Sequence, residues 1–391
     1  MTNKCKRAAI ISTHPIQYNA PLFKLLAQQK DLVIKVFYTW GETVLKSKFD
    51  HGFGKIIEWD IPLFDGYDYA FPRNISRNPG SHHFWGINNP DLINDIKTWK
   101  PDSLLIFGWN YRTHLRVMRY FKGRIPIYFR GDSTLLDEKP GIKQILRRTI
   151  LRNIYKNIDY AFYVGTRNKE YYITHGLKEE QLLFAPHAID NDRFMENSEH
   201  KKQNALEWRR SLGISDDHMV FLFAGKYESK KNPEILISVL KTMNDREFYL
   251  IFVGNGVLED KLKENSRGYD NIYFLDFQNQ KTMPIVYRMA DVFVYPSIGP
   301  GETWGLAVNE AMACGVPIIV SDKVGCAVDL VIEGSTGFTF SSGNVDDLRS
   351  KMLYFINQRD QISTIGAKGS QYIQKYSFNA IMKAMTREMT K

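Results

Sequence analysis

The sequence predicts an α/β protein made of two successive Rossmann-like domains, each built on a parallel sheet. Short apolar runs alternate with segments of helical length along most of the chain, a pattern typical of βαβ units. A polar, charged stretch at 190–211 interrupts this pattern, and we interpret it as the interdomain connection. The 391 residues are enough for two such domains. We therefore expect an N-terminal domain at 1–195 and a C-terminal domain at 196–375.

Each half contains five apolar runs that read as strands. In the N-terminal half they are 7–12, 32–38, 103–107, 125–129 and 160–164. In the C-terminal half they are 220–224, 248–253, 272–275, 292–295 and 317–320. The last residues, 377–391, predict an amphipathic helix, because Phe378, Ile381 and Met385 fall on one face.

Composition limits the class of protein. Hydrophobic residues make up 43% and charged residues 24%, as in ordinary globular proteins. The net charge of +9 would suit phosphorylated small molecules, anionic lipid or nucleic acid, and does not choose among them. The three cysteines form no disulfide framework, and neither a signal peptide nor a membrane span is apparent. We expect a cytoplasmic protein.

The segment 300–322 carries the strongest chemical signal. It follows a predicted strand, so it lies at the carboxyl end of a parallel sheet, where open α/β folds bind ligands. A glycine-containing loop leads to a helix expected to begin near Thr303-Trp304, whose unpaired N–H groups would suit a diphosphate. Glu302 precedes this helix and Glu310 follows two turns later, on the order of 12 Å away. One carboxylate could bind sugar hydroxyls and the other ribose hydroxyls, unless both are ordinary surface or turn residues.

This segment resembles the glutamate motif of family 4 glycosyltransferases of GT-B fold, in which two glutamates are separated by seven residues. The matching positions are Pro296, Ser297, Glu302, Gly305, Leu306, Glu310, Ala311, Met312, Ala313, Gly315 and Pro317. The loop between Ser297 and Glu302 is one or two residues longer than usual. The resemblance implies two Rossmann-like domains facing across a cleft, with the C-terminal helix (376–391) returning to the N-terminal domain.

The resemblance continues elsewhere in the C-terminal half. The segment 223–231 is similar to the family's Gly-Arg-Leu-x-x-x-Lys stretch, with Lys226 in the arginine position and Lys231 in the lysine position. Two cations there could neutralise a departing diphosphate. Gly254-Asn-Gly256 is assigned mainly to chain reversal. The donor-binding residues that the resemblance implies are Gly225, Phe277, Thr303, Trp304, Gly305, Leu306 and Glu310, and its catalytic residues are Lys226, Lys231, Glu302 and Asp132.

The N-terminal half departs further from the family pattern. A polar loop after the first strand carries His14, Gln17 and Tyr18, which either contact acceptor or donor or belong to a capped structural loop. Gly131 replaces the family's histidine, and we place its neighbours Arg130 and Asp132 in the cleft. The stretch 185–190 resembles Pro-Asn-Gly-Val-Asp, with His187 and Ala188 as departures.

Two further features have competing interpretations. Asp190-Asn-Asp192 has the spelling of a metal-binding motif, but it lies outside the expected nucleotide pocket, so we assign no metal and no cofactor. Residues 141–156 predict a basic amphipathic helix without an acidic residue. Such a helix either contacts anionic lipid at the inner face of a membrane or simply covers a sheet.

The resemblance implies metal-independent, retaining transfer of a sugar from a nucleoside-diphosphate sugar, with a UDP-sugar favoured. The acceptor would be a glycan or a lipid-linked molecule, in polysaccharide or surface-glycan biosynthesis. Another GT-B enzyme, such as an epimerase or phosphorylase, and a noncatalytic sugar-nucleotide-binding protein stay open as alternatives. Nucleic acid is not expected as a partner, because recognised binding patterns are absent. Nothing in the sequence indicates the oligomeric state.

Overall fold

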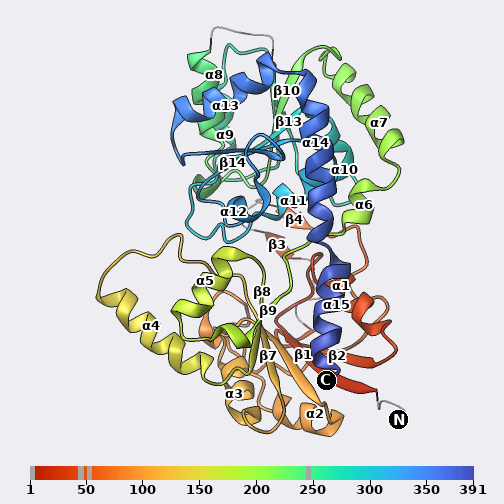
Figure 1. The fold of residues 1–391 in the computed structure, drawn as a ribbon, viewed down its shortest axis with the longest axis vertical. Helices are drawn as coiled ribbons and strands as arrows, with labels where there is room; N and C mark the ends of the chain where they lie inside the picture. The colour runs from red at the N-terminus through yellow and green to blue at the C-terminus, as the bar shows by residue number, and fades with distance from the viewer. Residues whose placement is uncertain (1–4, 43–47, 51–54, 244–247) are drawn as a thin grey trace. The chain divides into compact units, whose positions relative to one another are not determined.

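The computed structural model describes residues 5–42, 48–50, 55–243 and 248–391. The chain divides into two compact units (Figure 1). The first holds residues 1–48, 61–187 and 378–391, and the second holds 49–60 and 188–377. Among the described helices, none is long and apolar enough to cross a membrane.

The first unit is built on a seven-stranded sheet with strand order β5-β2-β1-β6-β7-β8-β9. Every neighbouring pair in this sheet is parallel. The strands are β1 (Lys6–Ser12), β2 (Leu32–Tyr38), β5 (Asp68–Ala70), β6 (Ser103–Phe107), β7 (Ile127–Arg130), β8 (Tyr160–Tyr163) and β9 (Leu182–Phe184). Strands β1 and β6 are almost wholly buried, which explains the apolar runs 8–11 and 104–107 within them.

Helices lie on both faces of this sheet (Figure 1). They are α1 (Ala20–Ala27), α2 (Leu92–Trp99), α3 (Arg112–Phe121), α4 (Ile142–Tyr155), α5 (Thr166–Thr174) and the C-terminal α15 (Phe378–Met389). The return of the last helix to this unit is confirmed: α15 packs on α1, and Tyr128 donates to the Glu388 carbonyl at 2.7 Å.

The second unit has a six-stranded sheet with order β12-β11-β10-β13-β14-β15. The strands are β10 (Met219–Ala224), β11 (Phe248–Val253), β12 (Ile272–Leu275), β13 (Val292–Tyr295), β14 (Ile318–Ser321) and β15 (Gly337–Phe340). All pairs are parallel. Counted within the unit the order is 3-2-1-4-5-6, which is that of a Rossmann fold. The strand order reverses between β10 and β13.

Helices again cover both faces of the sheet (Figure 1). They are α6 (Asn191–Met195), α7 (Ser198–Ser211), α8 (Glu234–Thr242), α9 (Glu259–Asn265), α10 (Met283–Arg288), α11 (Leu306–Ala313), α12 (Ala327–Leu330), α13 (Val345–Asn357) and α14 (Asp360–Tyr372). The core beneath α8 and α13 joins buried residues such as Phe221, Phe252, Leu236 and Phe355.

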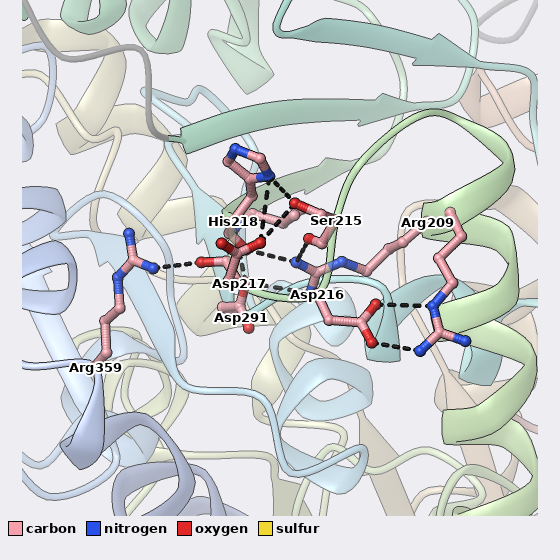
Figure 2. A network of polar contacts seen from close by, with 9 residues as sticks. Arg209, Ser215, Asp216, Asp217, His218, Asp291 and Arg359 are labelled. Carbon is pink, nitrogen blue, oxygen red and sulfur yellow. Dashed lines mark hydrogen bonds and ion pairs between the residues drawn. The ribbon is translucent and has the colours of Figure 1, made fainter.

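The stretch 190–211, which we interpreted as the interdomain connection, forms the helices α6 and α7. The Asn191 amide donates to the carbonyls of Ile373 and Tyr376 at 3.2 and 3.1 Å, so this segment packs within the second unit. A polar network fixes α7 to the start of β10 (Figure 2). In it the buried Arg209 donates to the His218 carbonyl at 2.5 Å.

Every predicted strand overlaps a strand of the structure, but several short strands were missed. These are β5, β9, β15 and the two-stranded sheet of β3 (Lys48–Asp50) and β4 (Lys55–Ile57). All except β15 are only three residues long, too short for a periodic sequence signal.

Candidate active site

The candidate site lies in the second unit, where β10 and β13 end side by side at the reversal of strand order. Open α/β sheets bind ligands at the carboxyl ends of strands flanking such a reversal. Lys231 follows β10 in a short 3-10 turn, Ser229–Lys231, and Tyr295 is the last residue of β13. The Ile298 amide donates to the Lys230 carbonyl at 2.8 Å, which ties the two loops together.

Lys231, Tyr295, Ser297 and Glu302 form one hydrogen-bonded cluster. Lys231 Nζ donates to Tyr295 Oη at 2.5 Å and makes an ion pair with the Glu302 carboxylate. Tyr295 Oη and Ser297 Oγ donate to the same carboxylate at 3.1 and 3.2 Å. Glu302 is 8% exposed, so this acid is held by three donors beneath the surface and is not a solvated turn residue.

The environment of Lys231 opposes its charge. Burial lowers the pKa of Lys231, while the Glu302 carboxylate acts in the opposite direction by stabilising the ammonium form. The ion pair with Glu302 leaves the cluster neutral overall. A ligand phosphate would therefore meet the Lys231 ammonium as the positive end of a pair that little water screens.

The segment between Glu302 and α11 is not helical, which corrects the predicted helix start near Thr303-Trp304. The helix begins at Leu306, and its cap, Gly305, has a left-handed φ of 99°. A Cβ at Gly305 would lie 2.8 Å from Val324 Cγ1, so a side chain there would be strained and crowded. The estimate of the Glu302–Glu310 span from helical rise is therefore wrong, since it assumed a continuous helix.

Glu310 faces inward from the second turn of α11. It is 4% exposed, and Tyr287 on α10 donates to its carboxylate at 2.8 Å. Trp304 is also buried, and its indole donates to Asn309 Oδ1 at 2.8 Å. Thr303 and Leu306, which flank the helix start, are half-buried. The buried Trp304 side chain therefore anchors the loop that precedes α11 to the helix itself.

The loops after β10 and β11 approach each other closely. A Cβ at Gly254 would lie 2.1 Å from the Gly225 carbonyl oxygen, and one at Gly256 would lie 2.6 Å from that of Tyr227. Chain reversal was the role predicted for Gly254 and Gly256. The structure adds a second role, because the lack of a side chain lets the two loops touch through their backbones. Lys226 is half-buried directly after Gly225, five residues before Lys231.

Asn255 connects this region to the loop that follows β12. Its amide donates to Asp276 at 2.8 Å and to Glu259 at 3.0 Å, and its Oδ1 accepts from the Phe277 amide at 2.9 Å. Phe277 also makes an edge contact with Trp59. Phe277 is therefore held in place at the edge of the predicted donor site.

In the first unit Arg130 is a buried clamp. It is 5% exposed, and its guanidinium donates to the carbonyls of Ala185 and Pro186 at 2.7 and 2.9 Å. Burial lowers the pKa of Arg130 to about 10, so it stays charged at neutral pH. Its position fixes the segment that precedes His187 and gives it a structural role that the sequence pattern did not reveal.

His187 and Asp132 lie together at the carboxyl end of β7. Their Nε2 and Oδ2 atoms are 3.8 Å apart, and Asp132 is half-exposed. Burial lowers the pKa of His187, and the Asp132 carboxylate opposes this effect. A histidine from the segment after β9, His187, thus reaches Asp132, which adjoins Gly131, the position where the family has its histidine. In the sequence, the only sign of this histidine was that His187 stands where the family pattern has asparagine.

Asp132 also lines a pocket of about 320 Å³ within the first unit. Its walls include Trp109, Ser133, Arg147 and Tyr172. The pocket combines aromatic rings with one acid and one base, a lining suited to a polar molecule with apolar faces.

His14, Gln17 and Tyr18 are half-buried in the loop between β1 and α1. His14 Nδ1 lies 2.8 Å from Thr13 Oγ1, and its ring makes an edge contact with Trp40. These residues occupy a strand end of the first unit, as the sequence predicts.

Sequence reasoning missed Tyr287, Tyr295 and Asn255, which hold the site residues in place. Tyrosines at strand and helix ends carry no motif, so only their neighbours in space reveal them. Asp190 of the apparent metal motif instead caps α6, accepting from the Arg193 amide at 3.3 Å. Within the described ranges, no group of three or more His, Cys, Asp or Glu side chains could hold a metal ion.

Known proteins resemble this chain in sequence and in fold. Residues 204–372 match the family model of glycosyl transferases group 1. Sulfoquinovosyl transferase SQD2 of Arabidopsis thaliana is 24% identical over 314 residues, which cover 77% of this chain and 58% of that protein. The chain spans about half the length of the first curated relatives it matches (58%, 47% and 45%).

Solved structures resemble the whole chain. Sucrose-phosphate synthase from Thermosynechococcus elongatus aligns with a TM-score of 0.73 at 18% identity, over 98% of both chains. Anabaena HepE, solved with UDP and glucose, aligns with a TM-score of 0.68 at 16% identity, over 99% of this chain and 100% of that one. Residues 204–372 are thus similar to the glycosyl transferases group 1, and the chain has the GT-B fold that these solved structures share.

Proposed function

We propose that this protein is a retaining glycosyltransferase that moves a sugar from a nucleoside-diphosphate sugar to a hydroxyl of a glycan or lipid-linked acceptor. The observation that carries the proposal is the buried Lys231–Tyr295–Glu302 cluster at the reversal of strand order. A cation there can hold the charge that develops on a departing diphosphate. Glu302 would bind hydroxyls of the transferred sugar, and Glu310 those of the ribose.

In this mechanism the bond between the sugar C1 and the diphosphate oxygen breaks while the acceptor oxygen bonds to C1 on the same face. The acceptor proton passes to a donor phosphate oxygen, and the nucleoside diphosphate leaves. Lys231, Lys226 and the amides at the start of α11 would hold its charge. The protein orients the reactants and needs no metal in this scheme.

A UDP-sugar is the favoured donor, because the similar HepE structure contains UDP and glucose. The pocket beside Asp132 and Trp109 is proposed as the acceptor site. A role in polysaccharide or surface-glycan biosynthesis would fit these substrates. The free cysteines Cys5, Cys314 and Cys326 fit a reducing, cytoplasmic location.

A thermal-shift screen with UDP-, GDP- and ADP-sugars tests the donor class, since a ligand that binds only the folded state raises its stability. We expect one nucleotide series to raise the Tm of the wild-type protein and to have a smaller effect on Glu310→Gln. The stabilising donor is then incubated with and without acceptor oligosaccharides or glycolipids. Conversion of the donor sugar without any acceptor would identify an epimerase instead. Stabilisation by none of the nucleotides would refute the proposal.

A further inference from the structure

Helix α4 exposes an apolar face to solvent. Ile142, Ile145, Leu146 and Ile150 are 77%, 64%, 58% and 56% exposed. At 3.6 residues per turn they project within an arc of about 140° on one side of the helix. The opposite side carries Leu151, Ile154 and Tyr155, which are buried in the core of the first unit. The helix therefore carries large apolar side chains both toward its own core and toward the outside, where they share the face with the exposed Thr149 and Asn153.

The exposed apolar face is bordered by cations. Lys143 and Arg152 flank it on opposite sides, Lys156 lies one turn beyond Arg152, and all three are exposed. The helix contains no acidic residue. An apolar stripe between basic side chains matches an anionic bilayer surface, whose acyl boundary takes the apolar groups and whose phosphates take the cations.

The helix is held firmly enough to act as a preformed surface. Glu138, just ahead of it, accepts from Gln144 at 2.9 Å and from Arg148 at 3.2 Å. Arg147 donates to Tyr171 Oη at 3.3 Å and lines the pocket beside Asp132. Arg148 is half-buried, whereas Arg147 is exposed despite its contact with Tyr171, so it adds a fourth exposed cation to Lys143, Arg152 and Lys156. In Figure 1 the N-terminal end of α4 reaches away from the sheet of its unit.

We infer that α4 docks the protein onto an anionic lipid surface. A symmetric dimer fits less well, because it would bring Lys143, Arg152 and Lys156 of one chain close to the same cations of the second chain. Large exposed apolar patches on a monomer mark sites of association, and the surrounding charge selects anionic lipid as the partner here. The inference stands independently of the donor chemistry, since α4 belongs to the first unit.

Vesicle sedimentation of the full chain tests the inference, with phosphatidylcholine alone or mixed with phosphatidylglycerol. We expect binding to the mixed vesicles that weakens as salt increases, and little binding to neutral vesicles. The combined variant Ile142→Ser, Ile145→Ser, Leu146→Ser and Ile150→Ser should bind at least about tenfold more weakly. So should a variant with Lys143→Gln, Arg152→Gln and Lys156→Gln.

Val257→Ser, at an 80% exposed valine of the second unit, is the matched control and should bind like the wild type. Circular dichroism and light scattering accompany each variant, so that misfolding and self-association are seen directly. Unchanged vesicle binding by both folded α4 variants would overturn the inference. A wild-type dimer that the serine variant converts to monomer, without vesicle binding by either, would assign the face to a second copy instead.

Discussion

Tyr287 donates its hydroxyl proton to the Glu310 carboxylate at 2.8 Å, and both side chains are buried. The bond fixes one oxygen of the acid that we propose to hold the ribose. Glu310→Gln should therefore weaken binding of the stabilising nucleotide about tenfold, the effect of losing a charged hydrogen-bond acceptor. Isothermal titration calorimetry with the nucleoside diphosphate measures this change.

Tyr287→Phe is the companion variant. It leaves the carboxylate in place but removes the group that orients it, so a smaller loss, about threefold, is expected. Equal nucleotide affinity in wild type and Glu310→Gln, with both proteins folded, would show that Glu310 does not bind the donor.

Lys231→Met should reduce turnover at least about a hundredfold, because the departing diphosphate would lose one of the two cations that we propose to hold its charge. The same change leaves Glu302 buried without its cation and should lower the free energy of unfolding by about 3 kcal/mol. Initial-rate kinetics and urea unfolding separate the two effects.

The double variant Lys231→Met with Glu302→Gln serves as the control. Removing both charges should restore most of the stability without restoring turnover. Recovery of turnover in the double variant would mean that Lys231 acts only by neutralising Glu302, and the catalytic assignment would then fail.

The sequence was most informative where a physical requirement recurs along the chain. Buried parallel strands need mostly apolar residues, so runs such as 248–253, and 32–38 with its single lysine, were recognisable. Helix α7 was missed because its surface is polar and charged, with only Ala205 and Arg209 buried. Its stability comes from tertiary bonds such as those of Arg209, which the polarity pattern does not contain.

Gly254→Ala should be much more destabilising than Gly213→Ala. Both glycines have positive φ, 136° and 77°, so both substitutions strain the backbone. A Cβ at Gly254 would also lie 2.1 Å from the Gly225 carbonyl oxygen, whereas a Cβ at Gly213 meets no atom within 4 Å. We expect a loss of about 1 kcal/mol at Gly213 and about 3 kcal/mol or more at Gly254, measured by urea unfolding. Similar losses at both positions would contradict the close contact between the two strand-end loops.

The candidate site shows a comparable division between what sequence could and could not reveal. Glu302, Glu310 and Lys231 stand at fixed spacings within a motif, so their residue types pointed to a shared chemistry. The partners Tyr287 and Tyr295 come from other elements and carry no spacing signal. Arg130 was expected at a cleft because it neighbours Gly131, the position of the family's histidine, and the sequence held no sign of the burial and the two carbonyl partners that make it a clamp.

The stability of the first unit should fall between about pH 6.5 and about pH 4 because of His114. Burial lowers the pKa of His114 to about 4, and its ring bonds to Thr39 and to the Gly108 carbonyl at 3.0 and 2.9 Å. The unfolded chain would bind a proton in this range that the folded chain resists, so unfolding becomes easier as pH decreases. The full effect is about 3 kcal/mol for a shift of about 2.5 pKa units.

His114→Gln cannot take up that proton, and its free energy of unfolding should vary less between about pH 7 and about pH 5 than that of the wild type. The comparison uses the pH slope, because the substitution also changes the hydrogen bonds. Burial lowers the pKa of His175 and His187 too, so some slope should persist in the variant. Identical slopes would rule out His114 as a source of the acid sensitivity.

Arg209 and Arg210 are adjacent on α7 but should differ sharply in their contribution to stability. In Figure 2 Arg209 reaches toward Asp291 and the carbonyls of Ser215 and His218. Arg210 instead forms an ion pair with Asp216, and both of these side chains are about half exposed. Arg209→Ala should lower the free energy of unfolding by about 3 kcal/mol, because it leaves the carbonyls and the Asp291 carboxylate without their buried donor. Arg210→Ala should leave it unchanged, since exposed ion pairs contribute little. Both variants should bind the donor with wild-type affinity, because this network lies at the amino ends of the strands. A loss of donor affinity in folded Arg209→Ala would instead show that the two ends of the sheet are coupled.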